Sequence, residues 1–140
     1  MRSRRLPIAA GAPGGVRCWR RFAAAALAIA FSAVTAWAHP KVVRSGPAAN
    51  AHLTQAPAKV QVWFHEELDA KGSKLTVWNE QNEQVDRGDS KVSLDDRKLI
   101  EVGLKPLPLG RYIVKWRAMA DDDKAVTQGQ FTFTVAAPRR

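Results

Sequence analysis

Three short groups of residues in this sequence carry side chains that can bind a metal ion. They are His39-Pro40, His65-Glu66 and residues 121–123, which are all aspartate. Imidazole nitrogens and carboxylate oxygens are common metal ligands, and nitrogen and oxygen in a tetragonal arrangement suit Cu(II). The residue types therefore suggest metal binding. Each group also has a simpler interpretation, as exposed polar surface or as a solvated turn.

The first 38 residues have the pattern of a secretory signal peptide. They contain six arginines and no acidic residue, followed by an apolar run over residues 22–34 that is interrupted only by Ser32. A run of this length suits a signal peptide and is too short to span a bilayer. Small residues at Ala36 and Ala38 favour cleavage after Ala38, and Val34-Thr35-Ala36 is a competing site. We therefore expect export to an extracytoplasmic space, with residues 39–140 as the mature domain.

Cleavage after Ala38 would make His39 the first residue of the mature chain. Its α-amino nitrogen and imidazole could then bind one metal ion as a chelate, whereas Pro40 has no N–H that could be deprotonated to join them. The amine has an ordinary pKa of about 7.7–8.0 and must lose its proton to bind, so affinity should rise with pH. The alternative is that His39 simply begins the mature chain without binding a metal.

Charge and cysteine content exclude several other classes of protein. The chain has 22 basic and 13 acidic residues, but the signal-like segment accounts for six of the basic ones, so residues 39–140 carry only +3. This modest charge gives nucleic-acid binding little support. The single cysteine, Cys18, precedes the expected cleavage site. The mature domain therefore has no disulfide, no thiolate metal site and no cysteine nucleophile.

Residues 39–140 alternate between apolar and polar side chains, as β-strands do. We expect strands at residues 41–45, 58–65, 74–79, 98–103, 111–119 and 128–135, with a weak edge strand within 84–94. Nothing in this region has a sustained helical period. About seven short strands in a domain of this size predict an all-β fold, an antiparallel β-sandwich.

Five segments of the mature region, in order, resemble the CopC family of periplasmic copper-binding proteins. The segments are the His39-Pro40 start, residues 41–48, residues 56–68, the Leu109-Gly110-Arg111-Tyr112-Ile113-Val114-Lys115-Trp116-Arg117 strand and residues 128–135. The resemblance implies an immunoglobulin-like, cupredoxin-type β-sandwich, a Greek-key barrel, that binds Cu(II) in copper homeostasis and resistance.

The sequence departs from the family where the family's copper site is completed by an Asp-x-His motif in the loop before the last strand. Counting from Trp116 places the aspartate at Asp122 and Lys124 at the histidine position. Counting back from Phe131 gives Asp123 and Ala125 instead. On either count the imidazole is absent and an aspartate is retained. A weak calcium site at the acidic triplet is a minor alternative.

Strand direction predicts which of these groups meet. In an up-and-down sandwich the first expected strand starts, and the second and sixth end, at the same pole. His39, His65, Glu66 and the acidic triplet should therefore lie close together, with His52 at the opposite pole. The expected metal ligands are His39, Asp122 or Asp123, and His65 or a water, with Glu66 binding weakly or orienting the amine.

The sequence therefore predicts a binding protein rather than an enzyme. We expect a monomer that buffers or delivers Cu(II), with an inner-membrane copper transporter as its partner and with no nucleic-acid partner. One alternative is an immunoglobulin-like interaction module that has lost its copper site. Another is a copper oxygenase, since such enzymes also use an N-terminal histidine chelate, but they are generally larger and have a broad aromatic face.

Overall fold

The computed structural model describes residue 11 and residues 39–139. Apart from Gly11, the expected signal peptide lies outside the described residues. Residues 39–139 fall within one compact unit, residues 37–140. Within the part of the chain that is described, no helix has the length and apolarity needed to cross a bilayer.

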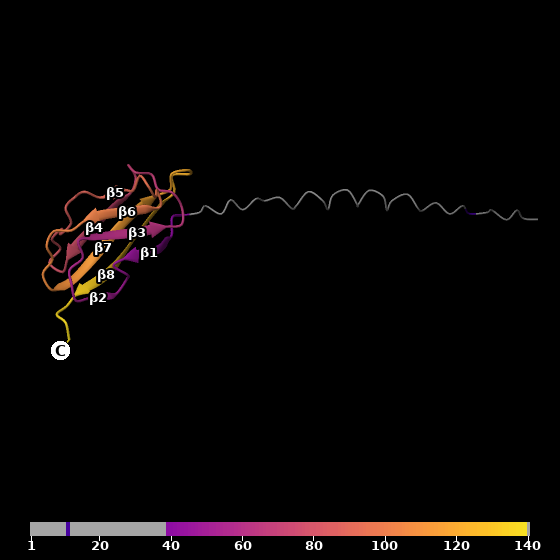
Figure 1. The fold of residues 1–140 in the computed structure, drawn as a ribbon. Helices are drawn as coiled ribbons and strands as arrows, with labels where there is room; N and C mark the ends of the chain where they lie inside the picture. Colours follow the sequence, from indigo (N-terminus) through magenta and orange to yellow (C-terminus); the bar gives the residue numbers. More distant parts are fainter. Residues whose placement is uncertain (1–10, 12–38, 140) are drawn as a thin grey trace, which may run out of the picture. The chain divides into compact units, whose positions relative to one another are not determined.

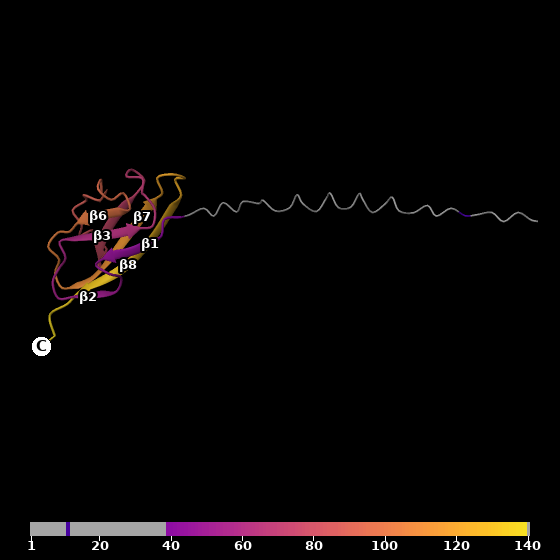
Figure 2. The same cartoon turned by 45° about the vertical axis from the view of Figure 1, so that its right-hand side comes forward.

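The described domain is a sandwich of two four-stranded sheets, which face each other in Figures 1 and 2. One sheet has the order β1-β3-β6-β5 and the other β2-β8-β7-β4. The strands are β1 (Val42–Gly46), β2 (Ala51–Leu53), β3 (Lys59–Phe64), β4 (Lys74–Asn79), β5 (Lys91–Val92), β6 (Leu99–Gly103), β7 (Gly110–Met119) and β8 (Val126–Val135). The all-β sandwich expected from the alternating pattern is confirmed.

The alternating side chains meet between the sheets. Val60 and Val62 in β3 are fully buried, and Phe64 is 2% exposed. Phe64 meets Trp116 of β7 edge to face, with 5.2 Å between the ring centroids. Contacts of this kind bury large aromatic surfaces between the sheets and stabilise the sandwich. Trp116 is partly buried and packs against the core.

The structure differs from the prediction in three details. The two sheets form an open sandwich and no closed barrel. The described residues form eight strands rather than about seven, because Ala51–Leu53 forms the additional strand β2. This strand carries His52 and pairs with β8 in parallel, so the sheets are not wholly antiparallel. Three residues are too few for alternation to be recognised in a sequence, which explains why β2 was missed.

Candidate metal centre

Three segments that are distant in sequence lie at one end of the sandwich. In Figures 1 and 2 the start of the described domain, the end of β3 and the loop between β7 and β8 lie at this same end. The His65 N–H donates to the Lys41 carbonyl over 3.1 Å, and the Asp121 N–H donates to the Glu67 carbonyl over 3.0 Å. An isolated bridge also pairs Leu68 with Ala120. The predicted common pole is therefore present.

His65 fastens the first residues of the domain to the segment that follows β3. Its Nδ1 accepts the Lys41 N–H over 2.9 Å. In the neutral ring the proton then lies on Nε2, which is 2.6 Å from Oε1 of Glu66. Both ring nitrogens are thus engaged, and His65 could bind a metal only by giving up one of these contacts. Its position indicates that it holds the chain beside His39.

Glu66 supplies the feature of this end that best fits a cation. Its side chain is 16% exposed. Its Oε1 is buried and, among the described residues, has no hydrogen bond of good geometry, although His65 Nε2 is close by. A buried carboxylate oxygen without an aligned donor is costly. The carboxylate of Glu66, in contact with His65 Nε2, is therefore compatible with a metal ion bound nearby.

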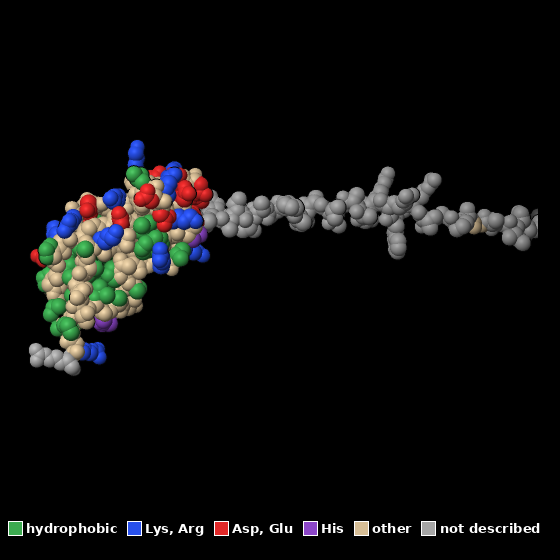
Figure 3. Space-filling view, in the orientation of Figure 1, with side chains coloured by type: hydrophobic (Ala, Val, Ile, Leu, Met, Phe, Trp, Pro, Cys, Tyr) green, Lys and Arg blue, Asp and Glu red, His purple; other side chains and the backbone are tan. Residues whose placement is uncertain are grey.

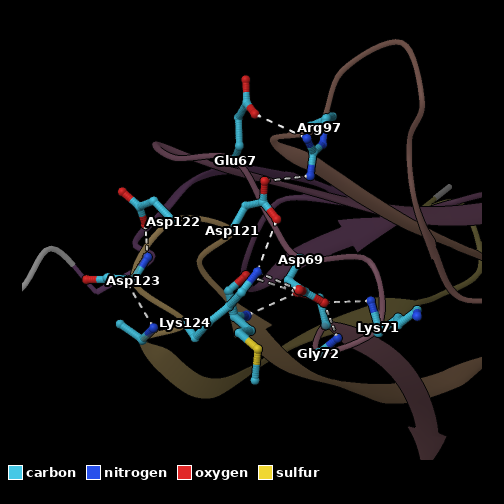
Figure 4. Close-up of polar contacts among 12 residues, drawn as sticks. Glu67, Asp69, Lys71, Gly72, Arg97, Asp121, Asp122, Asp123 and Lys124 are labelled. Carbon is cyan, nitrogen blue, oxygen red and sulfur yellow. Dashed lines mark hydrogen bonds and ion pairs between the residues drawn. The ribbon is translucent and has the colours of Figure 1, made fainter.

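The two candidate aspartates hold the turn that contains them. Oδ1 of Asp122 accepts the Asp123 N–H over 2.6 Å, and Oδ1 of Asp123 accepts the Ala125 N–H over 2.9 Å. Each carboxylate therefore uses one oxygen to stabilise the turn. Both residues are exposed. In Figure 4 they lie on the outer side of the loop, away from the cluster around Lys124.

Lys124 occupies the histidine position given by the count from Trp116, and its side chain forms ion pairs. Its Nζ lies 2.8 Å from Oδ2 of Asp69 and 3.3 Å from Oδ1 of Asp121. The pKa of Asp69 is lowered to about 2. The hydrogen bond from Lys124 has the largest effect, and the hydrogen bond from the Gly72 N–H has a smaller one. The hydrogen bond to Asp69 in turn raises the pKa of Lys124. The loop position thus holds a fixed positive charge.

The sequence interpretation missed Asp69, Arg97 and Glu67. Arg97 joins Asp121 at 2.9 Å and Glu67 at 3.7 Å, as Figure 4 shows. Only Asp69 had a local signal. Its Oδ1 accepts the N–H groups of both Lys71 and Gly72, which is a turn pattern that a polar stretch of this kind can indicate. Nothing local in the sequence indicates the pairing of Arg97.

A carboxylate-rich depression of about 340 Å³ opens at this end. Its lining consists of Glu66, Glu67, Lys98, Asp121 and Asp122. Figure 3 shows acidic side chains gathered at this end of the domain, with basic side chains among them. Neighbouring carboxylates attract cations, although Arg97 and Lys124 already neutralise part of this charge.

The predicted ligands share an end of the molecule but do not converge. His65 and Glu66 are in contact, and His39 is exposed and begins the segment that Lys41 ties to His65. Among the described residues, no three His, Cys, Asp or Glu side chains are close enough together to hold a metal ion. His52 is exposed on β2. It lies opposite Thr134, one residue before the end of β8. The ligand set stays a prediction.

The fold and this end of the molecule together define a small β-sandwich protein with a candidate cation-binding pole. The model of the CopC domain matches residues 42–136. The chain belongs to the CopC family.

Proteins with similar sequences have names that refer to copper. Copper resistance protein C of Escherichia coli is 34% identical over 116 residues, which cover 78% of this chain and 88% of that protein. Copper transport protein CutJ of Bacillus subtilis is 30% identical over 110 residues, or 78% of this chain. The match spans only 20% of the length of CutJ.

Two solved structures of similar fold are of proteins named CopC and PcoC. The crystal structure of PcoC, a methionine-rich copper resistance protein from Escherichia coli, matches with 36% identity and a TM-score of 0.55, covering 71% of this chain and all of that one. CopC from Methylosinus trichosporium OB3b has 24% identity and a TM-score of 0.66, covering 73% of this chain and 98% of that one. The second likeness supports the fold alone.

Proposed function

We propose that this chain is an exported copper-binding protein that buffers or delivers Cu(II). Membership of the CopC family and relatives named for copper resistance and transport support a role in copper handling. The observation that carries the proposal is the largely buried carboxylate of Glu66, which lies 2.6 Å from His65 Nε2 at the end of the sandwich where the described domain begins.

The proposed site depends on cleavage after Ala38. His39 would then provide its amine and imidazole, and Asp122 or Asp123 would provide one oxygen. His65 is engaged with Lys41 and Glu66, so water is the better candidate for the remaining position. Glu66 would bind weakly or accept a hydrogen bond from the amine.

Location, partner and assembly follow from this proposal. A cleaved signal peptide would place the domain in the periplasm, where a monomer could exchange copper with a transporter in the inner membrane. The protein would bind and release the ion without transforming a substrate. A site with one imidazole fewer than the family motif should hold Cu(II) more weakly, which suits a protein that passes its ion on.

Copper titration of the exported protein tests the proposal. First, N-terminal sequencing establishes whether His39 is the first residue. Cu(II) is then added in steps while the visible d–d absorption is recorded, and Zn(II) and Ca(II) serve as controls. We expect one equivalent of Cu(II) to saturate the absorption. A protein that begins with His39 but gives no saturable Cu(II) absorption would contradict the proposal and favour a metal-free interaction module.

A further inference from the structure

The outward face of the sheet formed by β2, β8, β7 and β4 carries positive charge and no negative charge. None of these four strands contains Asp or Glu. The strands place their basic residues at alternating positions that face away from the core. These residues are Lys74, Arg111, Lys115 and Arg117. Lys74 lies opposite Arg117 in the register, so like charges are neighbours on this face.

These cations lack the acidic partners that other basic residues of the domain have. Lys59, Arg97 and Lys124 each form an ion pair with a carboxylate. Among the described residues, no ion pair involves any of the four cations of this face, although Arg117 donates to the Gly72 carbonyl. Neighbouring like charges repel one another. This repulsion would be relieved by an anionic partner.

The same face contains a shallow hollow with hydrogen-bonding walls. The hollow has a volume of about 230 Å³, and its lining consists of Lys74, Thr76, Lys115, Trp116, Arg117 and Gln128. Beside it, the Lys115 ammonium lies 5.1 Å from the ring centroid of Trp78. Basic groups can pair with carboxylates, and the Gln128 amide can bind a peptide backbone. The Thr76 hydroxyl already donates to the Lys115 carbonyl and accepts from Trp78 Nε1.

We propose that this face binds an acidic peptide segment of a partner protein. A membrane surface suits it less well, because peripheral membrane binding relies on apolar side chains that enter the lipid. The exposed large hydrophobic residues of the described domain are Val42, Val43, Leu94 and Leu109, and none belongs to these four strands. The inference does not depend on copper binding and goes beyond it.

Fluorescence anisotropy with a labelled oligoglutamate peptide tests the proposal, with oligoglutamine as the uncharged control. The protein should bind only oligoglutamate, and added NaCl should weaken the binding. The double variant Lys74→Gln/Lys115→Gln should lose about tenfold in affinity, as expected for two lost surface charge contacts. The matched double variant Lys91→Gln/Lys105→Gln, which changes the net charge equally, should bind as the unmodified protein does.

A second measurement on the unmodified protein avoids any effect of substitution on folding. Oligoglutamate should protect Lys74 and Lys115 from amine acylation and leave Lys91 and Lys105 reactive, as read by mass spectrometry. Equal losses in the two double variants would reduce the effect to net charge and overturn the proposal. No binding, or binding to phosphatidylglycerol vesicles but not to oligoglutamate, would also overturn it. So would self-association that the Lys74→Gln/Lys115→Gln variant abolishes, because the occupant would then be a second copy.

Discussion

Lys124 in the loop after β7 reaches Asp69 in the segment after β3, with 2.8 Å between Nζ and Oδ2. This contact joins the loop after β7 to the segment after β3, as Figure 4 shows. An ammonium group has no lone pair with which to bind a metal, and its charge repels an incoming cation. On the count from Trp116, the position of the motif's histidine therefore disfavours metal binding here.

Replacing Lys124 with histidine should strengthen Cu(II) binding if the pole forms a site. The change Lys124→His removes a positive charge and adds an imidazole, whereas Lys124→Gln removes only the charge. We expect the order Lys124→His, then Lys124→Gln, then the unmodified protein, by competition with a copper chelator. The histidine variant should also shift the d–d band toward more nitrogen ligands. Equal affinities for the two variants would indicate that this loop does not face the bound ion.

The two alignments of the loop place the test histidine in different surroundings. Ala125 is only 9% exposed, and its N–H donates to Asp123. A histidine at residue 125 would therefore have to displace core atoms, and Ala125→His should lower the melting temperature without improving copper binding. Lys124 is exposed, so the count from Trp116 gives the position where a histidine can be tested.

Much of the fold could be predicted from the sequence, and the ion-pair network could not. The alternation of Val60, Val62 and Phe64 directly reflects which side of β3 is buried. The common pole followed from strand direction alone. The contacts of His65 with Lys41 and of Lys124 with Asp69 depend on the loop conformations that fold these residues together. No periodic pattern encodes such loop conformations.

Extending the chain by one residue before His39 should abolish tight Cu(II) binding. The added residue would turn the free amine of His39 into a peptide nitrogen, which removes one arm of the chelate while leaving the fold unchanged. His39→Ala should have a similar effect. His52→Ala is the matched control, because His52 is exposed on β2, away from the proposed ligands. Isothermal titration with Cu(II) would measure all three, and unchanged affinity in the extended protein would exclude the chelate.

His65→Ala distinguishes a positioning role from metal ligation. The variant loses the hydrogen bond from the Lys41 N–H, which is worth about 1 kcal/mol of folding stability. Since the start of the domain would then be less fixed, Cu(II) affinity should fall moderately. The number of nitrogen ligands read by electron paramagnetic resonance should stay the same. A loss of one nitrogen from the spectrum would instead make His65 a ligand.

The ion pair between Asp69 and Lys124 should make stability depend on acidic pH. The pKa of Asp69 is lowered from 3.8 to about 2 in the folded chain, so its contribution is fully present above 3.8. It should disappear as the pH falls through this range, because the carboxylate becomes protonated in the folded state as well. Asp69→Asn should therefore lower the melting temperature near neutral pH and converge with the unmodified protein near pH 2. If the melting temperatures of the two proteins differ by the same amount at every pH in this range, the ion pair contributes nothing to stability.

Gly129→Ala should destabilise the sandwich although it adds only one methyl group. Gly129 lies opposite Trp116 in the register of β7 and β8. A Cβ at Gly129 would press against Cζ2 of the Trp116 ring and lie 2.8 Å from Cε2. Because Trp116 also packs against Phe64, the indole has to shift within the core, and we expect a loss of about 1–3 kcal/mol.

Urea unfolding followed by tryptophan fluorescence would measure this loss. Gln130→Ala is the matched control in the same strand, because Gln130 is exposed and its truncation should change stability by less than about 0.5 kcal/mol. The double variant Gly129→Ala/Trp116→Phe adds a direct check, since the smaller ring leaves room for the methyl group. With phenylalanine at residue 116, Gly129→Ala should lower the free energy of unfolding by less than it does with Trp116. If the cost is the same with either ring, the close approach of Gly129 to Trp116 is not what limits residue 129 to glycine.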